Sequence, residues 1–115
     1  MTPFSALLND LCHTRQVRQK QLAYELEVDP SYLSALASGR KGVPSDAFLQ
    51  RLGEALKLSE TERGALQEAV KISQQKYRVP VKAHPRFYAA AWRMFQAAEN
   101  LPAEKLDVIM RILEL

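Results

Sequence analysis

The stretch Gln19-Lys-Gln-Leu-Ala-Tyr-Glu-Leu-Glu-Val-Asp-Pro-Ser-Tyr-Leu-Ser-Ala-Leu-Ala-Ser-Gly39 decides the fold of this chain. It contains two segments with helical spacing of apolar residues, 19–26 and 30–37, and only three residues separate them. Asp29 is a favourable N-cap, Pro30 suits the first position of a helix, and Gly39 follows where a left-handed C-cap is wanted. The stretch therefore predicts two short helices with sharply defined ends.

So short a connection does not allow two helices to lie antiparallel along their lengths, so we expect them to cross at a large angle. This is the geometry of a helix-turn-helix, whose second helix can enter the major groove of DNA. The first residues of that helix face the bases, which predicts a base-reading set of Pro30, Ser31, Tyr32, Ser34 and Ala35. The set is poor in side chains that bond a purine edge twice, so few base contacts and DNA shape should carry the specificity.

The same segment resembles the helix-turn-helix of the Xre family, which includes the Cro and phage repressor proteins. The matching positions are Gln19, Leu22-Ala23, Val28, Leu33, Leu36 and Ser38-Gly39-Arg40. The likeness continues through Pro44-Ser45 into Phe48-Leu49, Leu52-Gly53 and Ala55-Leu56, and covers about residues 4–72. The resemblance implies a compact five-helix domain in a DNA-binding transcriptional regulator.

Three residues depart from the family pattern. Glu27 stands at a turn position that usually holds Gly and is often left-handed, where another residue costs about 1–2 kcal/mol. Ala37 replaces the Glu common before the closing Gly, and Arg18 stands where a Ser or Thr N-cap is normal. None of these changes removes a DNA-contacting position.

Basic residues lie on both sides of the predicted recognition helix. Arg15, Arg18 and Lys20 flank the start of the preceding helix, and Arg40 and Lys41 follow the recognition helix. The formal charge of +3 permits nucleic-acid binding without demonstrating it. We expect the DNA backbone to be held on one side by Arg18, Gln19, Lys20 and the N–H groups at the start of the helix that begins at Gln19. Ser38, Arg40 and Lys41 should hold it on the other side.

Helical spacing elsewhere predicts an all-α chain. Further helices are expected at 3–14, at 46–56 after the cap Ser45, and from a Ser59–Glu62 capping box to about residue 75, burying Leu66, Ala69, Val70 and Ile72. These form a helix-turn-helix domain at 1–75, followed by a linker at 76–84 that contains Pro80 and ends at His84, directly before Pro85. Residues 85–115 should form a C-terminal helical hairpin.

This hairpin carries more apolar surface than two helices can bury against each other. We therefore expect it to form the dimer contact of a homodimer, although packing against its own five-helix core is the alternative. The expected dimerisation residues are Phe87, Trp92, Phe95, Ile109, Ile112 and Leu113.

No group of residues has the pattern of a catalytic, cofactor or metal site. His13 and His84 are far apart, and the single cysteine, Cys12, rules out an intrachain disulfide and is expected to be a buried thiol. We expect no enzymatic activity, no cofactor, no metal, no membrane partner and a cytoplasmic location, since no signal peptide or long apolar run occurs.

The predicted function is a sequence-specific transcriptional regulator, a repressor, that binds a palindromic operator in double-stranded DNA as a homodimer. One alternative is an antitoxin that binds a toxin as well as its own operator, with the hairpin as the toxin site. A second alternative is a protein-binding adaptor that has kept the fold without DNA affinity.

Overall fold

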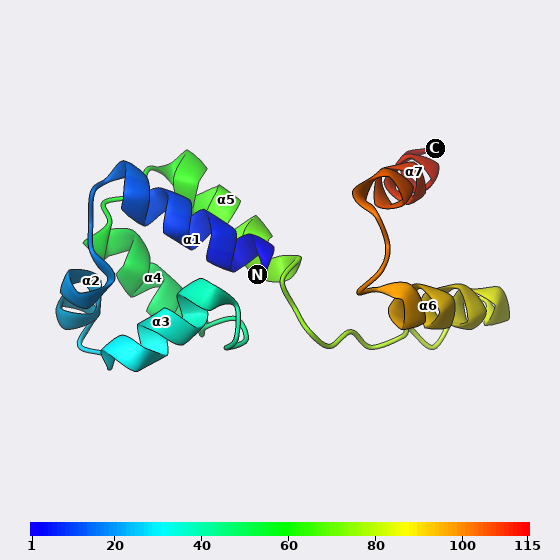
Figure 1. Ribbon diagram of the computed structural model, residues 1–115, viewed down its shortest axis with the longest axis horizontal. Helices are drawn as coiled ribbons and strands as arrows, with labels where there is room; N and C mark the ends of the chain where they lie inside the picture. The colour runs from blue at the N-terminus through cyan, green and yellow to red at the C-terminus, as the bar shows by residue number, and fades with distance from the viewer. The chain divides into compact units, whose positions relative to one another are not determined.

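The computed structural model describes all residues from Met1 to Leu115 and consists entirely of α-helices and their connections. The helices, labelled in Figure 1, are α1 (Pro3–Thr14), α2 (Gln19–Leu26), α3 (Pro30–Ser38), α4 (Asp46–Ala55), α5 (Glu60–Lys71), α6 (Pro85–Ala97) and α7 (Ala103–Glu114). The predicted all-α class is therefore confirmed. The chain divides into two compact units, Met1–Tyr77 and Arg78–Leu115. None of its helices combines the length and the apolar character needed to cross a membrane.

Side chains cap most helices of the first unit where local sequence predicts it. The Asp29 carboxylate accepts from the Ser31 N–H, and Ser59 and Glu62 form a complete capping box at the start of α5. Thr2 and Ser5 form a second capping box at the start of α1. Arg18 provides no side-chain cap for α2, as its identity predicts. Because each cap satisfies a backbone N–H within three residues, these helix starts follow from short-range chemistry.

The end of α5 differs from the prediction. The helix ends at Lys71 rather than near residue 75, and Ile72 is 56% exposed instead of buried. The residue that turns inward is Ser73, whose hydroxyl donates to the Ala69 carbonyl and accepts from the Phe4 N–H over 2.8 Å. The buried Ser73 hydroxyl is therefore satisfied by two backbone groups at the end of α5, and Ile72 lies on the exposed side.

The core of the first unit joins leucines from every helix. Leu22 and Leu26 of α2, Leu33 and Leu36 of α3, and Leu52 of α4 are at most 1% exposed. Helix α1 packs on α3 and α5, while α2 packs on α3 and α4 (Figure 1). Burying a leucine contributes about 1.5–3 kcal/mol, so this core holds the angle between α2 and α3.

The N-terminus of α1 joins the ends of two other helices. The Phe4 N–H donates a hydrogen bond to the hydroxyl of Ser73, which lies just after α5. Gly39, at the end of α3, lies against the backbone of Met1 and Thr2. A Cβ atom at Gly39 would lie 3.1 Å from the Met1 Cα and the Thr2 nitrogen, and the φ angle of Gly39 is +83°. Glycine is therefore required at this C-cap for both its conformation and its small size.

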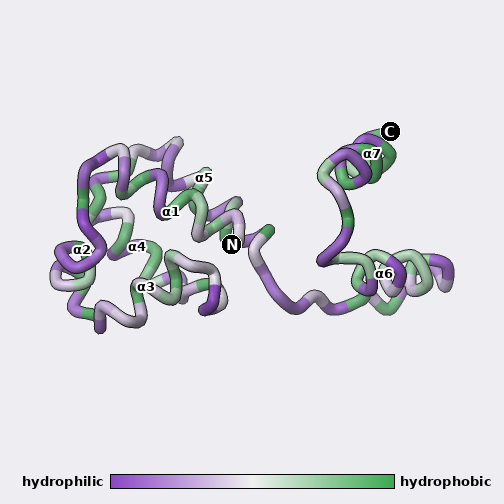
Figure 2. The backbone as a smooth tube through the Cα atoms, viewed as in Figure 1, coloured by the Kyte–Doolittle hydropathy of each residue, from purple (hydrophilic) through white to green (hydrophobic).

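The second unit contains the two predicted C-terminal helices, but they do not cover each other's apolar faces. Neither α6 nor α7 has a buried residue. Figure 2 shows hydrophobic residues recurring along both helices. Residues 98–100 form a turn, and Pro102 then precedes α7 in an extended conformation. The mutual burial expected of a hairpin is consequently absent.

Candidate nucleic-acid interface

The turn between α2 and α3 adopts the predicted left-handed conformation. Glu27, the C-cap of α2, has φ 56° and ψ 41°, and its N–H donates within the last turn of α2. Val28 is half-buried and its N–H donates to the Ala23 carbonyl over 3.0 Å. Asp29 then caps α3. The crossing of α2 and α3 is therefore held by backbone hydrogen bonds and leucine packing, despite the strain at Glu27.

The first turn of α3 presents a small, polar surface. Pro30 and Ser31 are exposed, while Tyr32, Ser34 and Ala35 are half-buried. The Ser31 N–H and hydroxyl both donate to the same Asp29 carboxylate oxygen, over 2.9 and 2.8 Å. The bond from the Ser31 N–H, followed by that from its hydroxyl, lowers the pKa of Asp29. Because Ser31 uses its only hydroxyl proton inside the protein, it offers DNA an acceptor, which suits the amino groups of cytosine and adenine.

Tyr32 is half-buried and its ring contacts residues on both sides. Its ring lies edge-to-face on Phe48 of α4, with centroids 5.7 Å apart and planes at 82°. The Lys41 ammonium lies 5.8 Å from the centre of the same ring. Such contacts give an aromatic side chain a fixed orientation. Tyr32 therefore joins the recognition helix to the basic loop that follows it.

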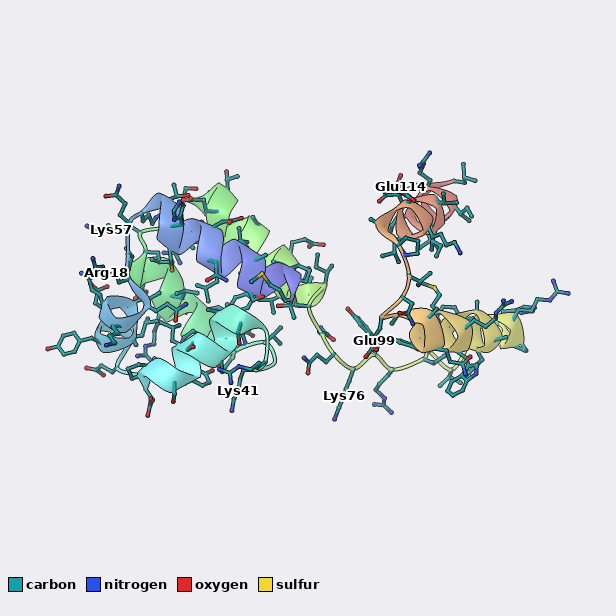
Figure 3. The ribbon with its side chains drawn as sticks, in the orientation of Figure 1. Arg18, Lys41, Lys57, Lys76, Glu99 and Glu114 are labelled. Atoms are coloured by element: carbon teal, nitrogen blue, oxygen red, sulfur yellow. The ribbon has the colours of Figure 1, made fainter.

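The residues predicted to contact the DNA backbone lie in two groups, one at the start of α2 and one at the end of α3. Arg18, Gln19 and Lys20 are exposed at the start of α2, where the first N–H groups have no side-chain cap. At the end of α3, Ser38, Arg40 and Lys41 are also exposed. Figure 3 shows the side chains of Arg18 and Lys41 projecting away from the helices. Cations at both places, together with a free helix N-terminus, form an arrangement suited to phosphate groups.

Within the second group, Ser38 orders the arginine beside it. The Ser38 hydroxyl donates to the Ala35 carbonyl over 3.1 Å and accepts from Arg40 Nε over 3.0 Å. Arg40 keeps its two terminal nitrogens free of protein partners. A guanidinium oriented in this way retains its paired donors for a phosphate.

Arg15 has a structural role that the sequence did not reveal. Its Nε donates to the Leu56 carbonyl over 2.7 Å, and one terminal nitrogen contacts both Glu62 carboxylate oxygens at 2.7 and 2.8 Å. The hydrogen bond from Arg15, and then that from the Ser59 N–H, lowers the pKa of Glu62. Arg15 therefore joins α1 to α5 and does not belong with the cations that flank α2.

Helix α2 also carries an exposed aromatic residue that was not among the predicted site residues. Tyr24 is 85% exposed and lies four residues after Lys20, on the same side of the helix. The four-residue spacing from Lys20 could have placed Tyr24 on this face from the sequence alone. Tyr24 extends the polar outer face of α2 by one turn.

Comparison with known proteins agrees with this geometry. A family model described as a helix-turn-helix domain matches residues 3–66, which include α1 to α4 and the first half of α5. The match confirms the predicted helix-turn-helix type of DNA-binding domain. Neither the curated proteins nor the solved structures gave a match to the chain.

Proposed function

The chain belongs to the helix-turn-helix domain family, and from this premise we propose that it is a transcriptional repressor of the Xre type that binds its operator as a homodimer. The observation that carries the proposal is the accessible first turn of α3 with cations on either side that make no ion pair within the protein. These cations are Arg18, Lys20, Arg40 and Lys41. Phosphate contacts from both sides would position α3 in the major groove.

In this proposal, few side chains recognise the base sequence of the operator. Ser31 and Ser34 bond base edges, Ala35 meets a thymine methyl group, and Tyr32 contacts a methyl group or a phosphate. Since none of them bonds a purine edge twice, deformability of the operator supplies part of the discrimination.

The homodimer is proposed from exposed apolar surface. Of the six residues expected at the dimer contact, Trp92 is 62%, Phe95 67% and Leu113 74% exposed. Phe87 and Ile112 are also exposed, and Ile109 is half-buried. Burial of each such side chain is worth about 1.5–3 kcal/mol, which a second copy can supply by pairing the same stripe with itself. A dimer would place two α3 helices about 34 Å apart, one DNA turn, as a palindromic operator requires.

Selection of bound fragments from random duplex DNA tests the proposal. The expected result is enrichment of an inverted repeat whose half-sites are separated by about ten base pairs. Enrichment of a single asymmetric site would contradict the homodimer on DNA, and the absence of any enrichment would contradict sequence-specific binding.

An antitoxin is the second candidate, because the same exposed faces of α6 and α7 suit a protein partner. Purification from the native cells under mild conditions distinguishes the two. A toxin recovered in a fixed ratio with the chain supports the antitoxin, whereas a homodimer with no other component supports the repressor.

A further inference from the structure

The excess positive charge of this chain lies outside most of its helix-turn-helix domain. Residues 1–68 contain eight Lys and Arg side chains and nine Asp and Glu side chains, a formal balance of −1. Residues 69–98 contain six cations and no Asp or Glu, namely Lys71, Lys76, Arg78, Lys82, Arg86 and Arg93. Long-range attraction of a polyanion therefore cannot come from the net charge of residues 1–68.

Several cations of residues 1–68 are also occupied by the fold. Arg15 is paired with Glu62, the Arg51 guanidinium donates to the Leu26 carbonyl, and Arg63 Nε donates to the Leu58 carbonyl over 3.3 Å. By contrast, Lys76, Arg78 and Lys82 are exposed and make neither an ion pair nor a side-chain hydrogen bond. They lie in the non-helical segment 74–84, and Figure 3 shows Lys76 projecting from it.

This segment begins near the basic loop that follows α3. Ser73, one residue before the segment, is hydrogen-bonded to Phe4, and Gly39, one residue before Arg40, lies against the backbone of Met1 and Thr2. The N-terminus of α1 thus contacts both the end of α5 and the end of α3. The segment consequently begins at the same end of the domain as Arg40 and Lys41, two of the proposed phosphate ligands.

We propose that residues 74–84 form a basic arm that lies along the phosphate backbone of the same duplex whose major groove α3 enters. This proposal rests on the proposed function. At roughly 3.3–3.6 Å per residue, a fully extended arm of this length spans at most about 36–40 Å, close to one turn of DNA. Its turn at Pro80–Ala83, where the Ala83 N–H donates to the Pro80 carbonyl over 3.0 Å, shortens that reach. Each cation that neutralises a phosphate releases counterions, so the arm adds affinity without sequence preference.

The experiment measures binding of the full chain to a mixed-sequence duplex over a range of salt concentrations, where electrostatic contacts alone act. The test variant is Lys76→Gln/Arg78→Gln, and the matched control is Lys76→Arg/Arg78→Lys, which changes both residues and retains both charges. The solution mass of each variant is measured alongside. We expect the salt slope to fall by about 0.9 for each lost phosphate contact in the glutamine variant, and to stay at its original value in the control.

Three results would overturn the arm. An unchanged slope in the glutamine variant, with the full chain still binding DNA, removes the arm and leaves the proposed function intact. If the glutamine variant loses binding to phosphatidylserine-containing vesicles while its DNA binding is unchanged, the segment binds a membrane surface instead. A full chain that binds no duplex at any salt concentration contradicts the proposed function itself and the arm with it.

Discussion

At the residue scale, Arg15 and Arg40 are two arginines close to the same helix-turn-helix whose contacts separate their roles. Arg15 contacts Glu62 and the Leu56 carbonyl, so its donors are used inside the fold. The Arg40 guanidinium makes its one hydrogen bond within the protein to the Ser38 hydroxyl, and Arg40 is exposed. Proximity to a recognition helix in sequence is therefore insufficient to identify a phosphate ligand, because the same guanidinium can join two helices.

Replacing Arg40 by Ala is expected to weaken binding to all DNA sequences and to lower the salt slope by about one unit. The contrasting variant is Arg15→Ala, which should lower the free energy of unfolding and leave the salt slope of the folded protein unchanged. Fluorescence anisotropy with labelled duplex at several salt concentrations gives both slopes. Equal slopes for Arg40→Ala and the unaltered chain would remove Arg40 from the interface.

The hydroxyl of Tyr32 can be tested separately from its ring. Tyr32→Phe keeps the edge-to-face contact with Phe48, so the free energy of unfolding should change by no more than about 0.5 kcal/mol. A lost hydroxyl contact to DNA should weaken binding by about 1–3 kcal/mol at the affected position. Tyr32→Ala would also lose the aromatic pair, worth about 0.5–1.5 kcal/mol beyond its buried area. Identical binding profiles for Tyr32→Phe and the unaltered chain would exclude a DNA contact from the Tyr32 hydroxyl and leave only the ring as a possible contact.

The ion pair between Arg15 and Glu62 predicts a dependence of stability on pH. Its hydrogen bonds lower the pKa of Glu62 in the folded state. As pH falls below the ordinary glutamate pKa of about 4.3, the unfolded state takes up the proton first, so the folded state loses stability until its own lower pKa is passed. Glu62→Gln keeps a side-chain acceptor for the helix cap but should lose stability at neutral pH and flatten this part of the pH profile.

Denaturant unfolding between pH 7 and pH 3 measures the effect. The control is Glu60→Gln, which removes an acidic side chain from the same first turn of α5 without removing an ion pair. If both variants changed the pH profile equally, a general charge effect would replace the ion pair as the cause.

At the scale of elements, α2, the turn and α3 form a pair whose angle is maintained from the core. Local features of the pair are mixed: Asp29 and Gly39 are well suited to their caps, whereas Arg18 caps nothing and Glu27 is strained. Leu22, Leu26, Leu33 and Leu36 compensate because all are at most 1% exposed. Tertiary packing thus supplies the stability that the local turn lacks.

Glu27→Gly is expected to stabilise the fold by up to about 1 kcal/mol, because relief of a left-handed residue exceeds the entropy lost by glycine. The matched variant Glu25→Gly removes the same charge from within α2, where glycine should cost about 1 kcal/mol. Urea unfolding of the two variants makes the comparison. Equal destabilisation by both changes would show that Glu27 makes a contact in solution that outweighs its backbone strain.

At the scale of the whole molecule, the two units of the chain differ greatly in how many of their apolar side chains are buried. Residues 1–77 contain every residue of the buried core, whereas α6 and α7 have none. Large side chains on these two helices, among them Trp92 and Phe95, are more than half exposed. In the proposed homodimer these side chains would form the dimer contact, so the second unit is the proposed determinant of oligomeric state.

Ending the chain at His84 should therefore produce a folded monomer with weakened affinity for the selected operator, since two linked recognition helices bind more tightly than one. This truncation retains residues 74–84, so loss of the dimer is separated from loss of the proposed arm. Light scattering and operator titration are the measurements. In the full chain, Trp92→Glu should give the same monomer. A truncated chain that remains dimeric and binds equally well would assign the dimer contact to α1–α5.

The sequence by itself determined the helices and their starts. Asp29, Ser45 and Ser59 each bond an N–H two or three residues further on, so their action requires no knowledge of the rest of the fold. The spacing of leucines likewise identified the core faces. The bounds of α1 and α2 follow from such local rules, whereas the left-handed conformation at Glu27 was expected only from the family resemblance.

Only the tertiary structure decided which distant groups meet. Arg15 and Glu62 are 47 residues apart, Phe4 and Ser73 are 69 apart, and Tyr32 finds Phe48 on another helix. No local pattern encodes these partners, because each depends on how helices pack around a shared core. For the same reason the sequence misjudged Ile72 and did not reveal the structural role of Arg15. Their environments are set by residues that only folding brings within hydrogen-bonding or van der Waals distance.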